Sequence, residues 1–310
     1  MWVSDKWVDY ELLDCSCGER LERWGKYILI RPDPQVIWRT SKDHPAWKTP
    51  HAHYERSRTG GGRWRVGGSL PDKWKMCYSG QWLHRTESLE LRAEETVDAS
   101  GLTFNVSLMN FKHTGLFPEQ AVNWDYISEI IGSAGRKISV LNLFAYTGGA
   151  TLAAAAAGAD VCHVDAARGM VARARENATA SGLDDKPIRW IVDDCAKFVE
   201  REIRRSRKYD ALIMDPPSYG RGPSGETWKL EDSLYDFLKL CSGVLSDEPL
   251  FVLINSYTTG LSPSTLTYIA ESVLGGVAES RELGLPVTSS GLMLPCGAAC
   301  RWTPELRVEN

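Results

Sequence analysis

The sequence lacks the features that mark several familiar protein classes. No apolar run approaches the roughly 18 residues that span a bilayer, and residues 1–6 (MWVSDK) lack the apolar stretch of a signal peptide. The net charge is only −4, so the chain as a whole has no basic excess of the kind that marks strong nucleic-acid binders. We expect a cytoplasmic protein without membrane contact, whose 310 residues suffice for two domains.

A complete metal-binding pattern is also missing. The eight cysteines include the pairs Cys15/Cys17 and Cys296/Cys300, which the His-x-His pair at 51–53 could in principle join. Neither pair has the spacing of a zinc knuckle, and no four-ligand set is present. Reduced, partly buried thiols are therefore favoured over a structural zinc, and we expect no metal.

The fingerprint of a dinucleotide-binding turn is absent as well. Gly148 and Gly149 follow an apolar strand pattern, but the residues after them, ATLA, do not supply the remaining glycines of G-x-G-x-x-G. NAD and FAD are therefore disfavoured. On its own, the glycine pair fits an ordinary strand–helix turn equally well.

The remaining patterns divide the chain into two parts. Residues 1–109 are predicted to be rich in strands, at 10–14, 24–30, 89–92 and 102–108, the last two forming a hairpin, with a loop at 41–72. From about 119 the pattern alternates between helices and short apolar strands. Strands are predicted at 138–144, 161–164, 188–192, 211–214 and 251–254, and two more within 280–303. This alternation predicts an α/β fold, with a mainly parallel sheet covered by helices on both faces.

In open α/β sheets, ligands bind at the carboxyl ends of the strands. The first strand is followed by NLFAYTGG (142–149), the second by Asp165, and the third by Asp193 and Asp194. Asp165 can accept hydrogen bonds from both hydroxyls of a ribose. Asp193 or Asp194 can bind an adenine amino group or cap the following helix, and both roles can coexist. Together these residues predict a ribose-bearing cofactor across the first two strands.

The segment after the fourth strand, Asp215-Pro216-Pro217-Ser218-Tyr219, is the most specific signal in the chain. Its prolines stiffen the backbone and remove two amide donors, so that nearby carbonyls are free to accept hydrogen bonds. With the Asp215 carboxylate and the flat ring of Tyr219, the segment suits an aromatic ring that bears an amino group. The alternative is a rigid turn with Tyr219 packed on the core.

The order of these motifs resembles that of class I S-adenosylmethionine-dependent methyltransferases. More narrowly, it is similar to the large-subunit ribosomal RNA cytosine-C5 and guanine methyltransferases. The segment His113-Thr-Gly-Leu-Phe-Pro-Glu-Gln120 resembles K-T-G-x-F-x-D-x-R of that group, although His113, Glu119 and Ala121 replace Lys, Asp and Arg. The resemblance covers about residues 105–303. It implies a Rossmann-like methyltransferase fold with a seven-stranded sheet at 110–310, preceded by a small β-rich accessory domain at 1–109.

The resemblance also implies S-adenosyl-L-methionine as the cofactor and a role for each motif. The loop 144–148 wraps the methionine part, Asp165 holds the ribose, and Asp194 holds the adenine amine. The residues implied to bind the cofactor are Thr114, Gly115, Phe144, Ala145, Tyr146, Thr147, Gly148, Asp165, Ala166, Asp193, Asp194 and Asp215. Those implied to be catalytic are Asp215, Pro216, Pro217 and Tyr219.

A missing residue narrows the expected target atom. Cytosine-C5 methylation needs a thiolate nucleophile, but neither 215–218 (DPPS) nor 255–257 (NSY) contains cysteine. Transfer to a nitrogen needs no covalent step, only alignment of its electron pair with the methyl group. We therefore expect methylation of a base nitrogen in ribosomal RNA. The alternatives are a methyltransferase for a small molecule or protein, and a non-catalytic cofactor- or RNA-binding module.

A local basic window is relevant to RNA binding. Residues 42–85 hold nine basic and three acidic residues, and five of the twelve tryptophans (38, 47, 64, 74 and 82) lie in or just before this window. Basic side chains bind phosphates, and aromatic rings stack on unpaired bases. A small domain with a tryptophan core and arginines on its solvated face would have the same composition.

Overall fold

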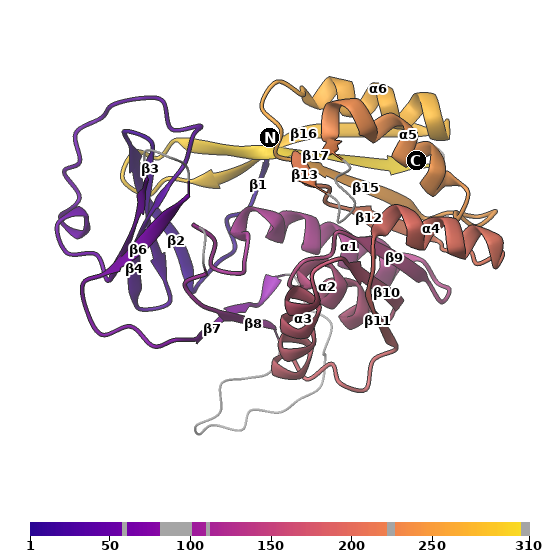
Figure 1. Ribbon diagram of the computed structural model, residues 1–310, viewed down its shortest axis with the longest axis horizontal. Helices are drawn as coiled ribbons and strands as arrows, with labels where there is room; N and C mark the ends of the chain where they lie inside the picture. Colours follow the sequence, from indigo (N-terminus) through magenta and orange to yellow (C-terminus); the bar gives the residue numbers. More distant parts are fainter. Residues whose placement is uncertain (58–60, 81–100, 110–111, 222–226, 305–310) are drawn as a thin grey trace.

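The computed structural model describes residues 1–57, 61–80, 101–109, 112–221 and 227–304. An eight-stranded sheet forms the centre of the larger part, and a five-stranded sheet lies beside it (Figure 1). The strands of the larger sheet are β1 (Trp2–Val3), β9 (Ser139–Leu143), β10 (Asp160–Asp165), β11 (Ile188–Val192), β12 (Ala211–Met214), β15 (Phe251–Ser256), β16 (Val277–Pro286) and β17 (Met293–Thr303).

The order of these strands is β1-β16-β17-β15-β12-β9-β10-β11. All neighbours pair in parallel except β17, which is antiparallel to both β15 and β16. The predicted, mainly parallel sheet is therefore confirmed. It has one strand more than the seven expected, because β1 adds to its edge.

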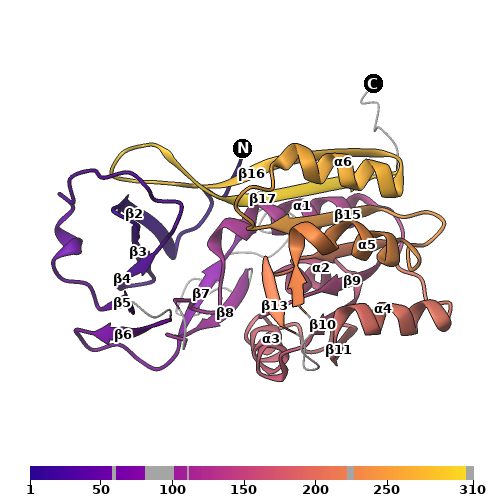
Figure 2. The ribbon, with the colours of Figure 1, turned by 45° about the horizontal axis from the view of Figure 1, so that its top comes forward.

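Six helices of the described part cover the two faces of this sheet (Figure 2). They are α1 (Ala121–Ser133), α2 (Gly149–Ala156), α3 (Arg168–Ala180), α4 (Cys195–Arg204), α5 (Leu230–Ser242) and α6 (Pro263–Leu274). Val140 and Ile213 share a core with α1 and α2, whereas their neighbours Leu141 and Leu212 share a core with α4, α5 and α6. Strands buried on both faces must be apolar throughout, which explains their continuous apolar sequences. None of the helices in the described ranges is both long and apolar enough to cross a membrane.

The five-stranded sheet contains β2 (Tyr10–Ser16), β3 (Glu19–Trp24), β4 (Tyr27–Pro32), β5 (Ala52–Arg56) and β6 (Gly62–Val66). The prediction of a loop over 41–72 is wrong, because this stretch contains β5, β6 and the 3₁₀ helix η1 (Pro45–Trp47). The prediction also missed β3, where only a turn was expected. The strand at 102–108 is confirmed as β8 (Leu102–Val106), which pairs with β7 (Trp74–Tyr78). Its expected partner at 89–92 lies outside the described residues.

The tryptophans of the basic window serve mainly to pack this part of the molecule. Trp38, Trp47 and Trp64 are half-buried, and each donates its indole N–H to an acceptor in the protein, at 2.8 to 3.0 Å. Trp74 is buried, and Trp82 lies outside the described residues. The packing interpretation therefore accounts for the tryptophans whose positions are known.

The long hairpin of β16 and β17 connects the two sheets (Figure 1). Beyond the end of β16, Val287 forms a bridge with Leu12 of β2, and the Thr288 N–H donates to the Leu12 carbonyl at 2.9 Å. The Ser289 hydroxyl donates to Asp14 at 2.8 Å. One apolar core also includes residues from both parts of the chain. The boundary between residues 109 and 110 stays a prediction.

Candidate active site

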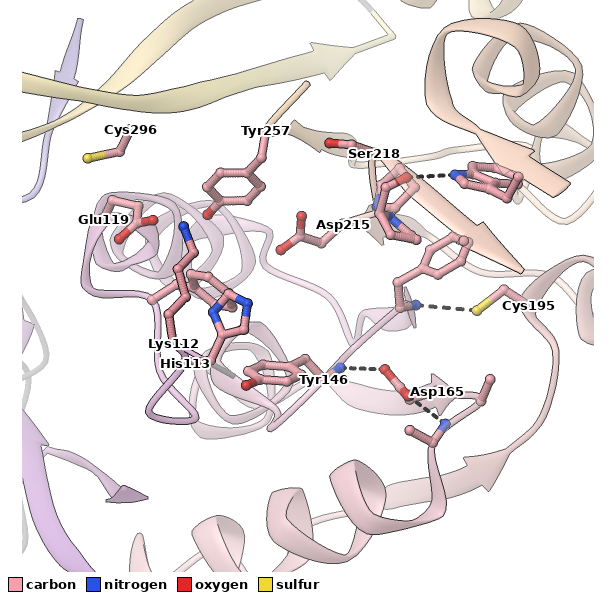
Figure 3. Close-up of a pocket in the computed structure, with 18 of the residues that line it drawn as sticks. Lys112, His113, Glu119, Tyr146, Asp165, Cys195, Asp215, Ser218, Tyr257 and Cys296 are labelled. Carbon is pink, nitrogen blue, oxygen red and sulfur yellow. Dashed lines mark hydrogen bonds between the residues drawn. The ribbon is translucent and has the colours of Figure 1, made fainter. Parts of the chain in front are cut away.

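A cavity of about 1080 Å³ opens at the carboxyl ends of the central strands (Figure 3). The strand order reverses between β9 and β12, since the chain continues from β9 to β10 and β11 on one side and from β12 to β15 on the other. Such a reversal leaves a crevice at the carboxyl edge of the sheet. The predicted site residues that line this cavity are Phe144, Tyr146, Asp165, Ala166, Asp193, Asp194, Asp215, Pro216 and Pro217.

The loop after β9 has a strained backbone. Phe144 and Tyr146 have positive φ values of 54° and 50°, and Gly148 has a φ of 90°. A left-handed conformation costs a non-glycine residue about 1–2 kcal/mol, so surrounding contacts must hold it. The Ala145 amide donates to the carbonyl of Val164 at 3.1 Å, and the Tyr146 amide donates to Asp165 at 2.9 Å. The loop is thereby fixed against the end of β10.

The loop also rests on the segment that precedes α1. The Thr147 hydroxyl donates to the Gly115 carbonyl at 2.7 Å, and Thr114 is buried. The predicted cofactor residues Thr114 and Gly115 therefore lie beneath the loop and do not line the cavity. A second cavity of about 50 Å³ adjoins the loop. It is lined by the remaining predicted residues Ala145, Thr147 and Gly148, together with Phe144, Tyr146 and Asp215.

Asp165 ends β10 and faces the large cavity. One carboxylate oxygen accepts from the Tyr146 amide at 2.9 Å, and the other accepts from the Ala167 amide at 2.8 Å. Each oxygen has two lone pairs, so both retain capacity for a ligand hydroxyl. Burial raises the pKa of this carboxyl above its ordinary value, and the two amide hydrogen bonds oppose the effect.

The two aspartates after β11 have structural partners as well as places on the cavity wall. Asp194 caps α4 by accepting from the Lys197 amide at 2.9 Å, and Asp193 forms an ion pair with Arg201. The helix-capping role of Asp194 is therefore confirmed, and its second expected role remains compatible with its position. Val192, beside them, is 44% exposed and gives this wall an apolar edge.

Asp215 lies at the end of β12, where both cavities meet. Burial, assisted by the negative charge of Glu119, raises the pKa of Asp215 from 3.8 to about 7. The Pro217 carbonyl accepts a hydrogen bond from the indole of Trp228 at 2.7 Å. Trp228 packs with Phe144 and Phe237, with ring centroids 5.5 to 5.7 Å apart, so an aromatic cluster holds the turn.

Tyr219 was predicted to stack on the target ring, but it does not line the cavity. The ring is 53% exposed, and the residues on either side of it, Ser218 and Gly220, form the wall instead. The reason is the short hairpin of β13 (Tyr219–Arg221) and β14 (Thr227–Lys229). Successive residues of a strand point to opposite faces, so Tyr219 turns away when its neighbours face inward.

The wall opposite the aromatic cluster was predicted from the sequence only through the segment 113–120. It comes largely from β3, β4 and the segment after them, and from the residues around α1 and β15. These residues are Arg20, Arg31, Pro32, Asp33, Pro34, Gln35, Lys112, His113, Phe117, Glu119, Tyr257, Thr259 and Cys296. Arg31 forms two hydrogen bonds with the buried Glu22, at 2.6 and 2.7 Å, and Arg20 pairs with Asp33. Both guanidinium charges are thus balanced within the wall.

No cysteine of the described part is poised as a nucleophile at this site. Cys195 and Cys296 both line the cavity, but burial raises the pKa of each thiol, and the Cys296 thiol donates to the Leu294 carbonyl at 3.4 Å. Cys241 is buried on the apolar face of α5. A thiol held in its neutral form is a poor nucleophile. Within the described ranges, no group of three or more potential ligands gathers around a possible metal position.

Comparison with known proteins assigns this architecture. The model of the S-adenosylmethionine-dependent methyltransferase family matches residues 69–246, more than half of the chain. The chain belongs to this family. A solved S-adenosylmethionine-dependent methyltransferase from Agrobacterium tumefaciens is 34% identical, with a TM-score of 0.85 over 97% of this chain and 92% of that one.

Other relatives of this methyltransferase are more distant. The methyltransferase SMU.776, solved in complex with SAH, is 19% identical over 96% of this chain and 75% of that one, with a TM-score of 0.70, and shows the fold alone. The ribosomal RNA large subunit methyltransferase K/L of Shewanella frigidimarina is 30% identical over 145 residues. That match covers 46% of this chain and 19% of the relative, so the chain spans about a fifth of the length of the curated relatives it matches.

The residues of the cavity fit S-adenosylmethionine, the cofactor of the family. The free lone pairs of Asp165 suit ribose hydroxyls, and the apolar edge at Val192 suits the flat adenine ring. The cofactor supplies an electrophilic methyl group on a sulfonium centre. Aromatic surface suits such a cationic group, and the cavity offers it at Phe144, Trp228 and Phe237.

Proposed function

We propose that this methyltransferase modifies a nitrogen of a base in RNA, with ribosomal RNA as the substrate. The observation that carries the proposal is the Asp215-Pro216-Pro217 turn, whose carboxylate faces the cavity with a pKa of about 7. Such a carboxylate accepts a hydrogen bond from an amine, and it can take up the proton that the amine releases on methylation. The curated relatives are ribosomal RNA large subunit methyltransferases, which supports RNA as the substrate class.

Each predicted residue has a place in this proposal. Asp165 and Ala166 hold the ribose, Asp193 and Asp194 the adenine, and the loop from Phe144 to Gly148 the methionine part. Thr114 and Gly115 support that loop from below. Asp215, Pro216 and Pro217 orient the target base, while Tyr219, exposed beside the cavity, can stack on a base only outside it.

The accessory part is proposed to hold the RNA. We treat residues 1–109 as the substrate domain and 110–310 as the methyltransferase domain, acting together in the cytoplasm. Arg63 and Arg65 are exposed on the edge strand β6, and Arg56 and Lys48 are exposed near it in sequence. Replacing Arg63 and Arg65 with glutamine should lower RNA affinity and reduce the slope of log K against log salt by about 1–2, without changing binding of S-adenosylhomocysteine.

Methyl transfer to RNA is the direct test. The protein is incubated with labelled S-adenosylmethionine and unmodified large-subunit ribosomal RNA, and the RNA is digested to nucleosides for mass spectrometry. We expect an N-methylated nucleoside with the wild type and none with Asp215→Ala, which should still bind S-adenosylhomocysteine. Tyr268→Ala, at a site that is 76% exposed on α6, is the control and should behave as the wild type.

A small polar molecule is the second candidate substrate. The observation that favours it is the second wall of the cavity, whose arginines are already paired with Asp33 and Glu22 and so offer no free charge to a phosphate. Cofactor binding without transfer to any RNA, together with transfer to a small amine, would replace the RNA proposal with this one.

A further inference from the structure

A chain of polar side chains runs behind the cavity from β17 to the residue after β15. The Arg301 guanidinium donates to Asn123 Oδ1 at 2.9 Å, and Asn123 Nδ2 donates to Gln120 Oε1 at 3.0 Å and to Asn255 Oδ1 at 3.1 Å. Gln120 Nε2 then donates to the Tyr257 hydroxyl oxygen at 2.7 Å. Asn123, Gln120 and Asn255 are buried, so each of these hydrogen bonds is costly to break.

The direction of this chain is fixed at its first member. A guanidinium can only donate, so the atom of Asn123 that faces it must be the carbonyl oxygen. The Asn123 amide nitrogen therefore faces Gln120, which orients the Gln120 amide with its nitrogen toward Tyr257. Arg301 itself is held between Trp2 and Tyr126, 3.8 and 4.3 Å from their ring centroids.

The consequence falls on the hydroxyl hydrogen of Tyr257. Its oxygen already accepts from Gln120, so the hydrogen must point elsewhere, and no residue of the described ranges accepts it. Tyr257 lines the cavity, and Figure 3 shows it beside Glu119 and Asp215, which face the same space. Tyr257 is thus a hydrogen-bond donor aimed at a ligand.

Two carboxylates accompany this donor. Glu119 is only 3% exposed. In the described structure its carboxylate accepts a hydrogen bond from its own backbone amide and from no other residue. Asp215 is partly buried, and no described residue donates a hydrogen bond to its carboxylate. A carboxylate that is shielded from water and accepts from no other residue is unfavourable, so both are available as acceptors for a ligand.

From this set of one donor and two acceptors we infer that the enzyme holds its target base by an amidine edge, an amino group beside a ring nitrogen. The ring nitrogen accepts from the Tyr257 hydroxyl, and the amino group donates to Asp215 and Glu119. Adenine, cytosine and guanine each have such an edge, whereas uracil has no amino group. This inference rests on the proposed function and makes Tyr257 a positioning residue for the base.

The test compares Tyr257→Phe and Gln120→Glu in the full-length protein with large-subunit ribosomal RNA as the substrate. The first variant removes the donor. The second offers a carboxylate to the Tyr257 hydroxyl and so turns its hydrogen away from the cavity. Each should lower kcat/KM for RNA by about ten- to a hundredfold and leave the affinity for S-adenosylhomocysteine near that of the wild type. The double variant should be no worse than the more impaired single one, because both changes remove the same hydrogen bond.

The outcomes separate this inference from the function on which it rests. RNA methylation with an unchanged kcat/KM in Tyr257→Phe would leave the RNA function intact and overturn the role of Tyr257. A methylated uridine as the wild-type product would overturn the amidine edge. Loss of S-adenosylhomocysteine binding in both variants would show that the polar chain only supports the fold, which also overturns the inference. Absence of transfer to any RNA would refute the RNA function and this inference together.

Discussion

Replacing Asp215 with asparagine should stabilise the protein while abolishing methyl transfer. Burial and the Glu119 charge raise the pKa of Asp215 from 3.8 to about 7, so the folded protein resists its ionisation. Above that pH the folded state holds a carboxylate that is less costly in the unfolded chain. At about 1.36 kcal/mol per pH unit, this pKa difference lowers the stability of the wild type by at most about 4 kcal/mol. Asparagine stays neutral, so the variant does not lose this stability.

This gain depends on pH in a defined direction. The pKa is higher in the folded state, so ionisation of Asp215 lowers the free energy of unfolding as the pH rises from 3.8 to about 7, and has no further effect above that range. The advantage of Asp215→Asn should therefore be about 4 kcal/mol at a pH of roughly 8 and fall to about 2 kcal/mol at a pH of roughly 5.

Urea unfolding followed by tryptophan fluorescence, at several pH values between these limits, measures the difference directly. Asp236→Asn, on the exposed face of α5, is the matched control and should change stability little at any pH. The methyl-transfer rate of the wild type should rise with an inflection near the pKa of Asp215. A stability difference between Asp215→Asn and the wild type that is the same at every pH would refute the raised pKa of Asp215. A variant that is less stable than the wild type at the alkaline end would refute it as well.

Three further changes test other parts of the structure. Asp165→Ala should weaken binding of S-adenosylhomocysteine at least about tenfold by calorimetry, and unchanged affinity would remove Asp165 from the site. Gly149→Ala should lower stability by about 1–3 kcal/mol, because its Cβ would come within 2.6 Å of a tryptophan ring. Gly169→Ala, in α3, meets nothing within 4 Å and should not lower stability in the same melting assay. Arg31→Met should cost about 3–5 kcal/mol in chemical denaturation by leaving the buried Glu22 carboxylate unpaired, and a loss below about 1 kcal/mol would contradict that reasoning.

The central strands could be predicted because burial on both faces leaves a clear signal. The strand expected at 211–214 coincides with β12, in which all four residues are buried. By contrast, β6 has the sequence GRWRV, and its outer residues Arg63 and Arg65 face solvent at the edge of a sheet. A short, polar edge strand resembles a loop in its composition, so β6 was missed. Its short neighbour β5, with the sequence AHYER, was missed with it.

Only one wall of the candidate site could be predicted from the sequence. The rule that ligands bind at strand ends identified Asp165 and Asp215 from local sequence, because each directly follows its strand. The opposite wall depends on how the two sheets pack, which brings Arg20 and Arg31 within the same cavity as residues almost 200 positions away. The resemblance to a known segment included Glu119. The ion pairs and the burial of the residues around it depend on the packing of the two sheets, so the sequence alone did not predict them.

The hairpin of β16 and β17 also sets the order in which the molecule can assemble. Ser289 binds Asp14 across 275 positions of sequence, so the outer edge of β2 has no partner until the last strands have been synthesised. Contacts of such long range form late, after the local elements on either side of them. Because the N-terminal sheet supplies one wall of the cavity, a nascent chain that already contains every strand-end aspartate still lacks a complete substrate site. We therefore expect the substrate site to be completed only after both sheets have formed.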